Sequence, residues 1–184
     1  MLERYYPIHS TLELDTFFKS YVPLIKNQLA IFGIDTGIYG ISGDHLGLQT
    51  ISSSEFNLTH KHISSYSEVI KEGVIHERRN NTYKLNDFLI AAGVELQSIE
   101  TFEPKPNADV SKLKPGFEHI AMKVDKYDEL ESFFRKNNLP IDKSVEFGVS
   151  KFFKTKFVNL VEIEFRNDYL WESLTKEKSS QRHS

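Results

Sequence analysis

The sequence contains no cysteine. This absence excludes disulfide scaffolds, zinc sites built on thiolates and cysteine nucleophiles, and it fits a reducing compartment. Long apolar runs are also missing, because the longest stretch, 88–96, is interrupted by Gly93 and Glu95. That stretch is shorter than the roughly 18 apolar residues of a membrane helix, and the charged N-terminus lacks the apolar core of a secretory signal. We therefore expect a cytoplasmic protein with no membrane partner.

The chain carries only a small excess of negative charge. The 23 basic residues nearly balance the 26 acidic ones, which leaves a formal net charge of -3. Because nucleic-acid binding needs a basic stripe, we expect no nucleic-acid partner. The apolar fraction of 39% is enough for a folded core. Phosphate loops, dinucleotide fingerprints, nucleophile elbows and HExxH motifs are absent as well.

The segment 1–39 has the apolar periodicity of helices. Pro23 predicts a break or a kink in it, because proline lacks the donor N–H. Gly33 is a plausible end of the helical segment. We interpret 1–39 as a helical N-terminal extension that covers one side of the domain or forms an oligomer contact, so a homodimer is one expected assembly. The apolar positions with helical spacing are Leu14, Phe17, Phe18, Tyr21, Ile25, Leu29 and Phe32.

An internal repeat follows this extension. The segments 44–49 and 118–123 share one template: acid, histidine, aliphatic, small, aliphatic or Met, polar. Each is followed by a helical pattern and then by three strand-like segments. The pattern predicts an α+β fold in which paired βαβββ modules form a cupped mixed β-sheet.

The modules have sequence boundaries. We place the first module at 40–104, with a turn expected at Asn80 and Asn81 between two of its strands. The second covers 105–175 and includes a connector rich in proline, a tight turn at 158–159 and a short C-terminal helix. The polar tail, 176–184, is expected to be disordered.

Alternation along four of the predicted strands gives each strand an apolar face and a polar face. The polar faces carry His45 and Glu95 in the first module, and His119 and Glu164 in the second. Imidazoles and carboxylates suit a divalent ion such as zinc, nickel, manganese or iron. The sequence therefore predicts a metal site in the cup, with the identity of the metal left open.

Two features of these strands qualify the metal prediction. Glu162 lies on the same face as Glu164, so the choice of the last ligand stays open between them. Asp44 and Glu118 alternate onto the opposite face from the histidines that follow them, so we do not expect them to orient those imidazoles. Each His or Glu taken singly is more often an ordinary polar residue of a strand. The duplication of the pattern is what favours a metal site.

At these residues the chain resembles the vicinal oxygen chelate superfamily, which includes glyoxalase I, extradiol dioxygenases, methylmalonyl-CoA epimerase and bleomycin-resistance proteins. The strongest match is 116–124, which is similar to the opening strand of the family's second module. The segments 94–96 and 163–165 resemble its glutamate strands, and 44–46 its first histidine strand. Within the superfamily, the helical extension and the segment 72–75 are most similar to the YecM-type family.

The resemblance implies how such a site would work. It implies metal ligands at the four positions named above and a small substrate bound through two adjacent oxygens. The metal stabilises an enediolate, while Glu95 or Glu164 moves the proton as general base. Four polar side chains on the same faces would hold a substrate carboxylate or phosphate, or pair with the glutamates. They are Gln49, Gln97, Lys123 and Arg166.

These expectations favour isomerase, epimerase or lyase chemistry. An iron(II) extradiol-type dioxygenase is an alternative, with His45, His119 and Glu164 as its ligands. Glu95 argues against it, because a fourth protein ligand takes a position that catechol and oxygen need. The other alternative is a non-catalytic small-molecule binding protein with the same cup.

Overall fold

The computed structural model describes residues 11–75, 77–109, 111, 116–156 and 162–181. The helices in these ranges are α1 (Thr11–Ile31), α2 (Thr36–Tyr39), α3 (Ser53–Ile63), α4 (Tyr127–Lys136) and α5 (Leu170–Gln181). The strands of the first module are β1 (Ile41–Gln49), β2 (Ser67–Ile75), β3 (Arg78–Ala91) and β4 (Val94–Phe102). Those of the second are β5 (Gly116–Val124), β6 (Lys143–Phe147), β7 (Ser150–Lys156) and β8 (Glu162–Arg166).

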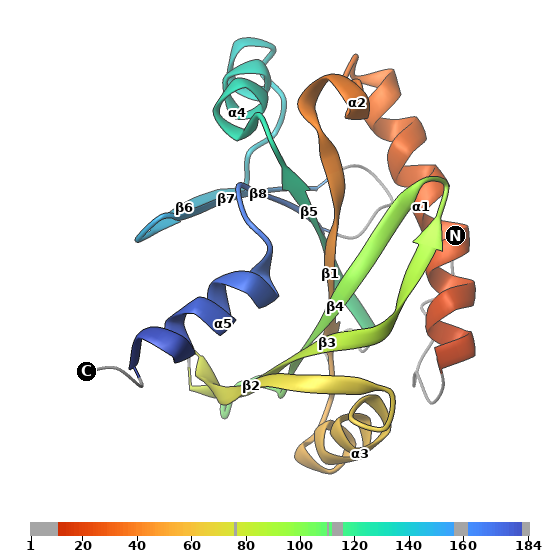
Figure 1. Ribbon diagram of the computed structural model, residues 1–184, viewed down its shortest axis with the longest axis vertical. Coiled ribbons are helices and arrows are strands. Elements are labelled where there is room, and N and C mark those ends of the chain that lie inside the picture. The colour runs from red at the N-terminus through yellow and green to blue at the C-terminus, as the bar shows by residue number, and fades with distance from the viewer. Residues whose placement is uncertain (1–10, 76, 110, 112–115, 157–161, 182–184) are drawn as a thin grey trace.

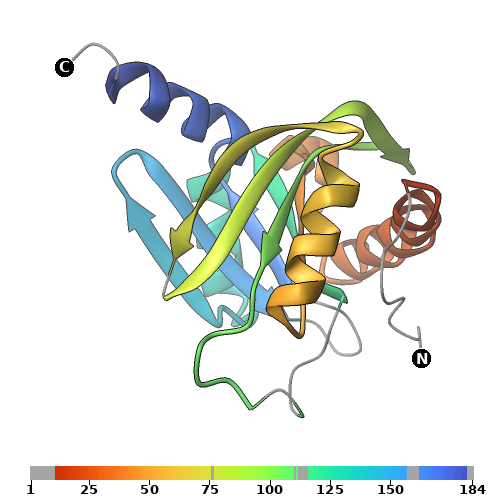
Figure 2. The ribbon, with the colours of Figure 1, turned by 90° about the horizontal axis from the view of Figure 1, so that it is seen from below.

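All eight strands form one mixed sheet in the order β2-β3-β4-β1-β5-β8-β7-β6. The pairs β1–β4 and β5–β8 are parallel, whereas the neighbouring strands at the centre, β1 and β5, are antiparallel. The two modules therefore join within one chain, and the expected α+β fold with paired βαβββ modules is confirmed. Figures 1 and 2 show that the sheet curls, with α1, α3 and α4 outside the curl and α5 on its concave side.

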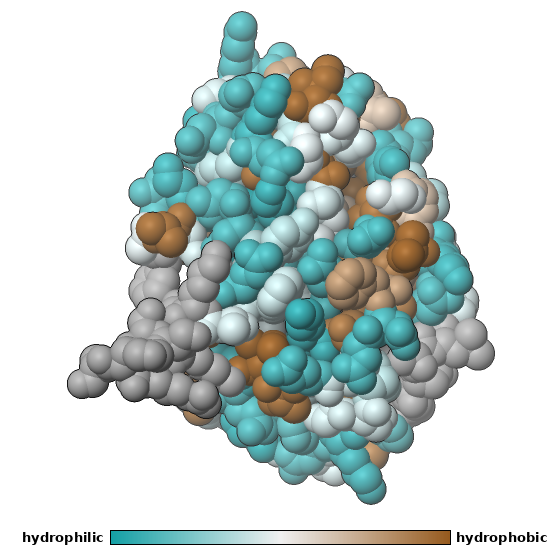
Figure 3. Space-filling model, in the orientation of Figure 1, coloured by the Kyte–Doolittle hydropathy of each residue, from teal (hydrophilic) through white to brown (hydrophobic). Residues whose placement is uncertain are grey.

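The hydrophobic core lies between the convex face of the sheet and the outer helices. Leu14, Phe18 and Ile25 of α1 are fully buried there, as expected from their helical spacing. At the other end of the sheet, Phe134 of α4 packs against Phe153 of β7, with ring centroids 5.0 Å apart. Burial of each such side chain contributes roughly 1.5–3 kcal/mol to folding. On the face seen in Figure 3, apolar residues appear only in small scattered groups among hydrophilic ones.

The helical segments differ from the expectation in two places. Of the break or kink expected at Pro23, the break is absent, because helix α1 runs through this residue. Pro23 and Lys19 both lie on the exposed face, so water can satisfy the carbonyl group that loses its helical partner. Helix α5 extends to Gln181, into the segment for which a disordered tail was expected. Within the described part of the chain, every helix is too short or too polar to cross a membrane.

The expected turn at Asn80 and Asn81 was wrong, because both residues lie inside β3. The chain turns earlier, next to Glu77, whose φ is 64°. The amide groups of both asparagines find partners inside the fold: Asn80 donates to Glu100, and Asn81 donates to the hydroxyl group of Tyr83. These bonds offset part of the cost of burying the amides, although Oδ1 of Asn80 has no hydrogen-bond partner among the described residues. The other turn, expected at 158–159, lies outside the described residues.

Candidate metal centre

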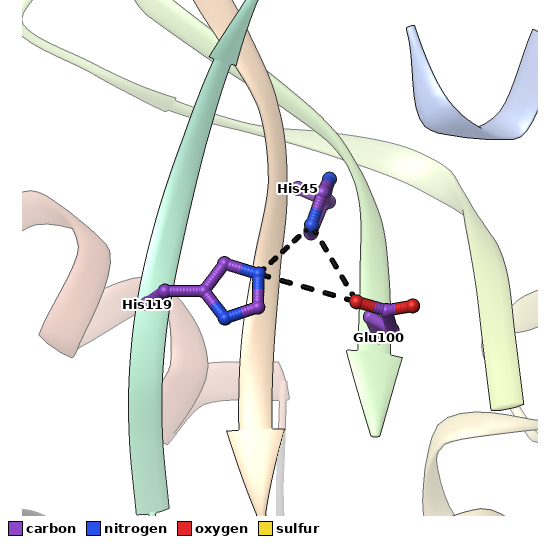
Figure 4. Close-up of side chains that lie close together, drawn as sticks. All are labelled: His45, Glu100 and His119. Atoms are coloured by element: carbon purple, nitrogen blue, oxygen red, sulfur yellow. Dashed lines mark hydrogen bonds and ion pairs between the residues drawn. The ribbon is translucent and has the colours of Figure 1, made fainter. Parts of the chain in front are cut away.

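Two histidines and one glutamate converge on the concave side of the sheet. Nε2 of His45 in β1 lies 3.0 Å from Nε2 of His119 in β5. Oε2 of Glu100 in β4 lies 3.7 Å from the first nitrogen and 4.0 Å from the second. Figure 4 shows the three side chains pointing toward a common centre from three adjacent strands. We call these residues the His–Glu–His triad.

The spacing within the triad fits one divalent ion. Donors that bind a metal at about 2.1 Å lie roughly 3.0–3.4 Å apart in octahedral or tetrahedral geometry. The three atoms lie within 4.8 Å of one another, and both imidazoles are almost fully buried. Small adjustments of the side chains would bring all three donors into ligand distance. Two imidazoles and a carboxylate also match the donor preferences of zinc, manganese, nickel and iron.

The register between β1, β4 and β5 brings the three residues of the triad together. In the antiparallel pair at the centre of the sheet, His45 lies opposite Ala121 and His119 lies opposite Gly47. The imidazole of His119 lies directly over Gly47, since a Cβ atom there would come within 2.2 Å of Cε1 of His119. Gly47 also pairs with Glu100 in the parallel neighbour β4. The small residue of the repeated template therefore makes room for the triad.

A β-bulge brings Asp44 to the same centre. Gly43 pairs with Met122 and His45 with Ala121, so Asp44 is an extra residue in β1. A bulge of this kind places two successive side chains on one face. Oδ2 of Asp44 accepts a hydrogen bond of 2.9 Å from Nδ1 of His45. The expectation that Asp44 faces away from His45 was therefore wrong, because strict alternation does not hold across a bulge.

The charges around the triad act on its members in opposite directions. Burial alone would lower the pKa of His45, but the nearby Asp44 carboxylate, with Glu100 behind it, raises it above its ordinary value. Burial lowers the pKa of His119 well below its ordinary value, and Lys154 and His45 lower it further. Burial raises the pKa of Glu100, although His45 and the hydrogen bond from Asn80 oppose the shift. Arg166 also lowers the pKa of Glu100, but among the described residues no lysine or arginine forms an ion pair with it.

Glu164 lies beside the triad but is bound to basic side chains. Its two oxygens contact Nη1 of Arg166 at 2.7 Å and Nζ of Lys154 at 3.3 Å. Burial would raise its pKa, but His119, Arg166 and Lys154 together lower it to about 2. The other candidate for the last ligand, Glu162, accepts a hydrogen bond of 2.7 Å from the same lysine. Neither carboxylate belongs to the group of donors that converge on one centre in the described part of the chain.

Glu95 is not brought to the histidines. It is exposed in β4 and pairs with Ile90 of β3, several residues before the point where β4 meets His45. Leu96 and Ile99, three positions apart, both lie in the core, so regular alternation stops between them. This shift places Glu100 on the concave side, and the sequence reasoning missed it. The sequence alone does not separate the two glutamates, because Val94-Glu95 and Ile99-Glu100 both match the aliphatic–glutamate pair of Ile163 and Glu164.

The four residues expected to bind substrate are engaged within the protein. Gln49 accepts a hydrogen bond from Arg78, and Gln97 accepts one from the indole of Trp171. Lys123 is paired with Asp125. Arg166 contacts carboxylates on three sides, those of Asp44, Glu164 and Asp168. The structure thus shows pairing inside the fold for each of them.

Comparisons with known proteins bear on the fold. No family model matches the sequence, and no curated protein matches it significantly. A solved structure described as "Structural Genomics, Protein EC4020" matches 90% of this chain and 92% of its own, with a TM-score of 0.68 and 13% identity. This likeness shows a shared fold over nearly the whole chain.

Two further solved structures are less similar. The hypothetical protein BH1468 from Bacillus halodurans C-125 covers 68% of this chain and 93% of its own, with a TM-score of 0.49 and 15% identity. A glyoxylase/bleomycin resistance protein/dioxygenase domain from Frankia sp. EAN1pec covers 66% of this chain and 87% of its own. Its TM-score is 0.26 and its identity is 16%.

Proposed function

We propose that this chain is a divalent-metal-dependent enzyme of the vicinal oxygen chelate type, acting on a small molecule that offers two adjacent oxygens. The observation that carries the proposal is the His–Glu–His triad, built from strands of both modules and nearly closed off from water. The Glu100 side chain is only 13% exposed and has no lysine or arginine ion pair among the described residues, and burying such a carboxylate is costly in a folded protein. A bound divalent ion would offset that cost and use all three donors.

Each member of the triad has a role in this proposal. Nε2 of His45, Nε2 of His119 and Oε2 of Glu100 would hold the ion, and these three ligands leave positions open for two substrate oxygens. A divalent ion bound there supplies Lewis-acid chemistry, which stabilises negative charge on substrate oxygens and acidifies a neighbouring C–H. Glu100 takes the place that the sequence assigned to Glu95, including the role of proton acceptor. Asn80 fixes the other oxygen of Glu100 through a hydrogen bond of 2.9 Å.

Isomerase, epimerase or lyase chemistry is the first candidate reaction class. It requires a carboxylate that faces the substrate and accepts a proton from carbon. Glu164 is held by Arg166 and Lys154, so Glu100 is the better placed carboxylate. The four polar residues of the strands are occupied, so binding through the two oxygens would dominate recognition of the substrate.

An iron(II) dioxygenase is the second candidate, and one observation favours it. The triad has two histidines and one carboxylate, which is the ligand set of many non-haem iron(II) oxygenases. Glu95, the expected fourth protein ligand, lies exposed and away from the histidines. A position that catechol and oxygen need would therefore stay open.

Elemental analysis of protein purified without added metal tests the proposal. We expect about one divalent ion per chain, lost in the H45A/H119A double variant and in E100Q. The matched control is E95Q, which changes an exposed glutamate of the same strand and should keep its metal. Wild-type protein that remains folded yet takes up none of zinc, nickel, manganese or iron(II) would overturn the proposal and support a metal-free binding protein.

Reaction assays then separate the two enzyme classes. Protein loaded anaerobically with iron(II) is mixed with catechols, and oxygen uptake is followed. Uptake that depends on Glu100 supports the dioxygenase. The second assay uses small α-hydroxy carbonyl compounds in deuterated water without oxygen. NMR monitors whether the C–H proton next to the carbonyl group is exchanged for deuterium. Such exchange supports the isomerase class.

A further inference from the structure

A single buried carboxylate, that of Asp44, faces three donors from different parts of the chain. Nδ1 of His45 donates to it at 2.9 Å. The backbone N–H of Leu170, the first residue of α5, donates to its two oxygens at 3.2 and 3.3 Å. Nε of Arg166 forms an ion pair with it at 3.5 Å. The Asp44 side chain has no exposed surface, so its partners come from the protein.

The contact with His45 controls the orientation of a triad member. Because a carboxylate only accepts, Nδ1 of His45 must carry the hydrogen, and Nε2 is left to face His119 and Glu100. A metal-binding histidine usually has such a partner, which fixes the ring and its tautomer. Within the described residues His119 has none, since its buried Nδ1 has no hydrogen-bond partner.

The contact with Leu170 ties the C-terminal helix to the same carboxylate. Helix α5 lies on the concave side of the sheet, against β2 and β3 (Figure 1). Further contacts hold its start: the indole of Trp171 donates to Gln97, and the hydroxyl group of Tyr169 bonds with that of Ser42. The histidines of the triad are only 1% and 2% exposed. The start of α5 is thus docked beside a nearly closed site.

We propose that Asp44 is a positioning residue that orients His45 and anchors α5 with one carboxylate, so that metal binding and docking of the helix strengthen each other. The proposal rests on the proposed function, because it assumes an ion at the triad. Coupling of this kind is reciprocal: the factor by which docking raises metal affinity equals the factor by which metal favours docking. Movement of α5 away from Asp44 would remove the Leu170 donor from this carboxylate and so change its hold on His45.

The variant D44N tests the proposal with little change in shape. Asparagine has one acceptor oxygen, so its NH2 group must face one of the three donors. We expect metal affinity to fall by about 10- to 100-fold, as for other partners of metal-bound histidines. The matched control is E118Q, because Glu118 precedes the other histidine. Among the described residues Glu118 forms its ion pair with Arg78, at 3.9 Å, and not with His119. E118Q should bind metal within about threefold of wild type.

Hydrogen–deuterium exchange reads the second half of the proposal. In wild-type protein, metal should slow exchange of the Leu170 amide and of the first turn of α5. In D44N the same amides should exchange faster and respond less to metal. Equal metal affinity in D44N and wild type, or equal exchange at Leu170, would overturn the proposal.

Measurements without metal separate this proposal from the proposed function. Nitrogen chemical shifts of the imidazoles should show a hydrogen on Nδ1 of His45 in wild-type protein and a changed tautomer balance in D44N. If wild-type protein binds no metal, the proposed function fails. The tautomer and the exchange at Leu170 then still decide whether Asp44 positions both elements.

A second variant, L170P, tests the same proposal if D44N does not fold. L170P removes the N–H that reaches Asp44 and replaces the partly buried leucine side chain, at the first position of a helix, where proline is well tolerated. We expect faster exchange in α5 and a metal affinity that is several-fold weaker, with the tautomer of His45 retained. Unchanged metal affinity together with faster exchange in α5 would refute the coupling.

Discussion

The two modules share a backbone plan but support their histidines differently. His45 and His119 are 74 positions apart, and each lies opposite a small residue of the other's strand. Each follows an acidic residue in a β-bulge, since Glu118 is the extra residue of β5 as Asp44 is of β1. Asp44 binds its own histidine, whereas Glu118, one methylene longer, lies near Arg78 of the first module. The repeat therefore conserves the positions of the donors and not their supports.

The glutamates differ in the same way. Glu100 pairs in register with Gly47, and Glu164 pairs with Ala121, so they occupy equivalent places beside the two histidines. Glu100 has Asn80 as its hydrogen-bond partner, whereas Glu164 has Arg166 and Lys154. Equivalent backbone positions thus hold one carboxylate available to a metal and one neutralised by cations. The surrounding charges, and not the strand geometry, make this difference.

The largest expected effect is the difference in metal affinity between variants of the two glutamates. E100Q should lower metal affinity on the order of 100-fold or more, because it removes a charged ligand. E164Q should lower it by less than about tenfold, since Glu164 acts on the ion only from a distance. Isothermal titration with zinc measures both. Equal losses in the two variants would mean that Glu164 is a ligand as well.

Stability without metal should reverse that order. E164Q leaves Arg166 and Lys154 without their shared carboxylate, which should cost about 3 kcal/mol of unfolding free energy. E100Q removes a largely buried charge that has no lysine or arginine ion pair among the described residues, so its unfolding free energy should change by less than about 1 kcal/mol or rise. Urea unfolding of the metal-free proteins gives both values. A larger loss for E100Q would contradict the assignment of charges.

The third comparison is between Gly47, which lies opposite His119, and Gly73, which has more space around it. G47A places a Cβ atom within 2.2 Å of the His119 ring, so the ring must move, at a cost of about 1–3 kcal/mol. Metal affinity should fall as well. G73A is the matched control, because its added Cβ atom would meet only Lys71 at 3.7 Å. Thermal unfolding and zinc titration of both variants test this, and an unaffected G47A would place His119 elsewhere.

The smallest expected effect concerns Glu103, whose ion-pair partner is more exposed than the partners of Glu164. The pKa of Glu103 is also lowered to about 2, first by hydrogen bonds from Arg79, but Arg79 is 40% exposed. A lowered pKa contributes stability above the ordinary value of about 4.5, and this stability is lost as the pH falls toward 2. E103Q should therefore cost only about 0.5–1 kcal/mol at pH 7.

Unfolding free energies measured from pH 7 down to pH 2.5 check this prediction. The difference between E103Q and wild type should stay constant from pH 7 to about pH 5 and then shrink as the pH falls toward 2.5. A difference that stays constant over this range would mean that the Glu103 charge contributes nothing to stability.

Sequence patterns were sufficient for the fold because the repeat is regular at the level of whole elements. Each module has a strand, a helix and three strands, and the polar–apolar alternation placed His45 and His119 on the same side of the sheet. The errors occurred where alternation breaks. Asp44 sits in a bulge, and the shift between Leu96 and Ile99 exchanged Glu95 for Glu100. Neither irregularity is visible in a single strand, and aligning the modules on their aliphatic–glutamate pairs fits Glu95 as well as Glu100.

The pairing of β1 with β5 has a consequence for how the chain folds. The two imidazoles are brought together only when strands 74 positions apart in sequence find each other. Closing such a long loop is entropically unfavourable and tends to come late. A cation bound by both histidines would therefore bind only the folded protein and slow its unfolding. Its binding free energy would stabilise the two joined modules and neither module alone.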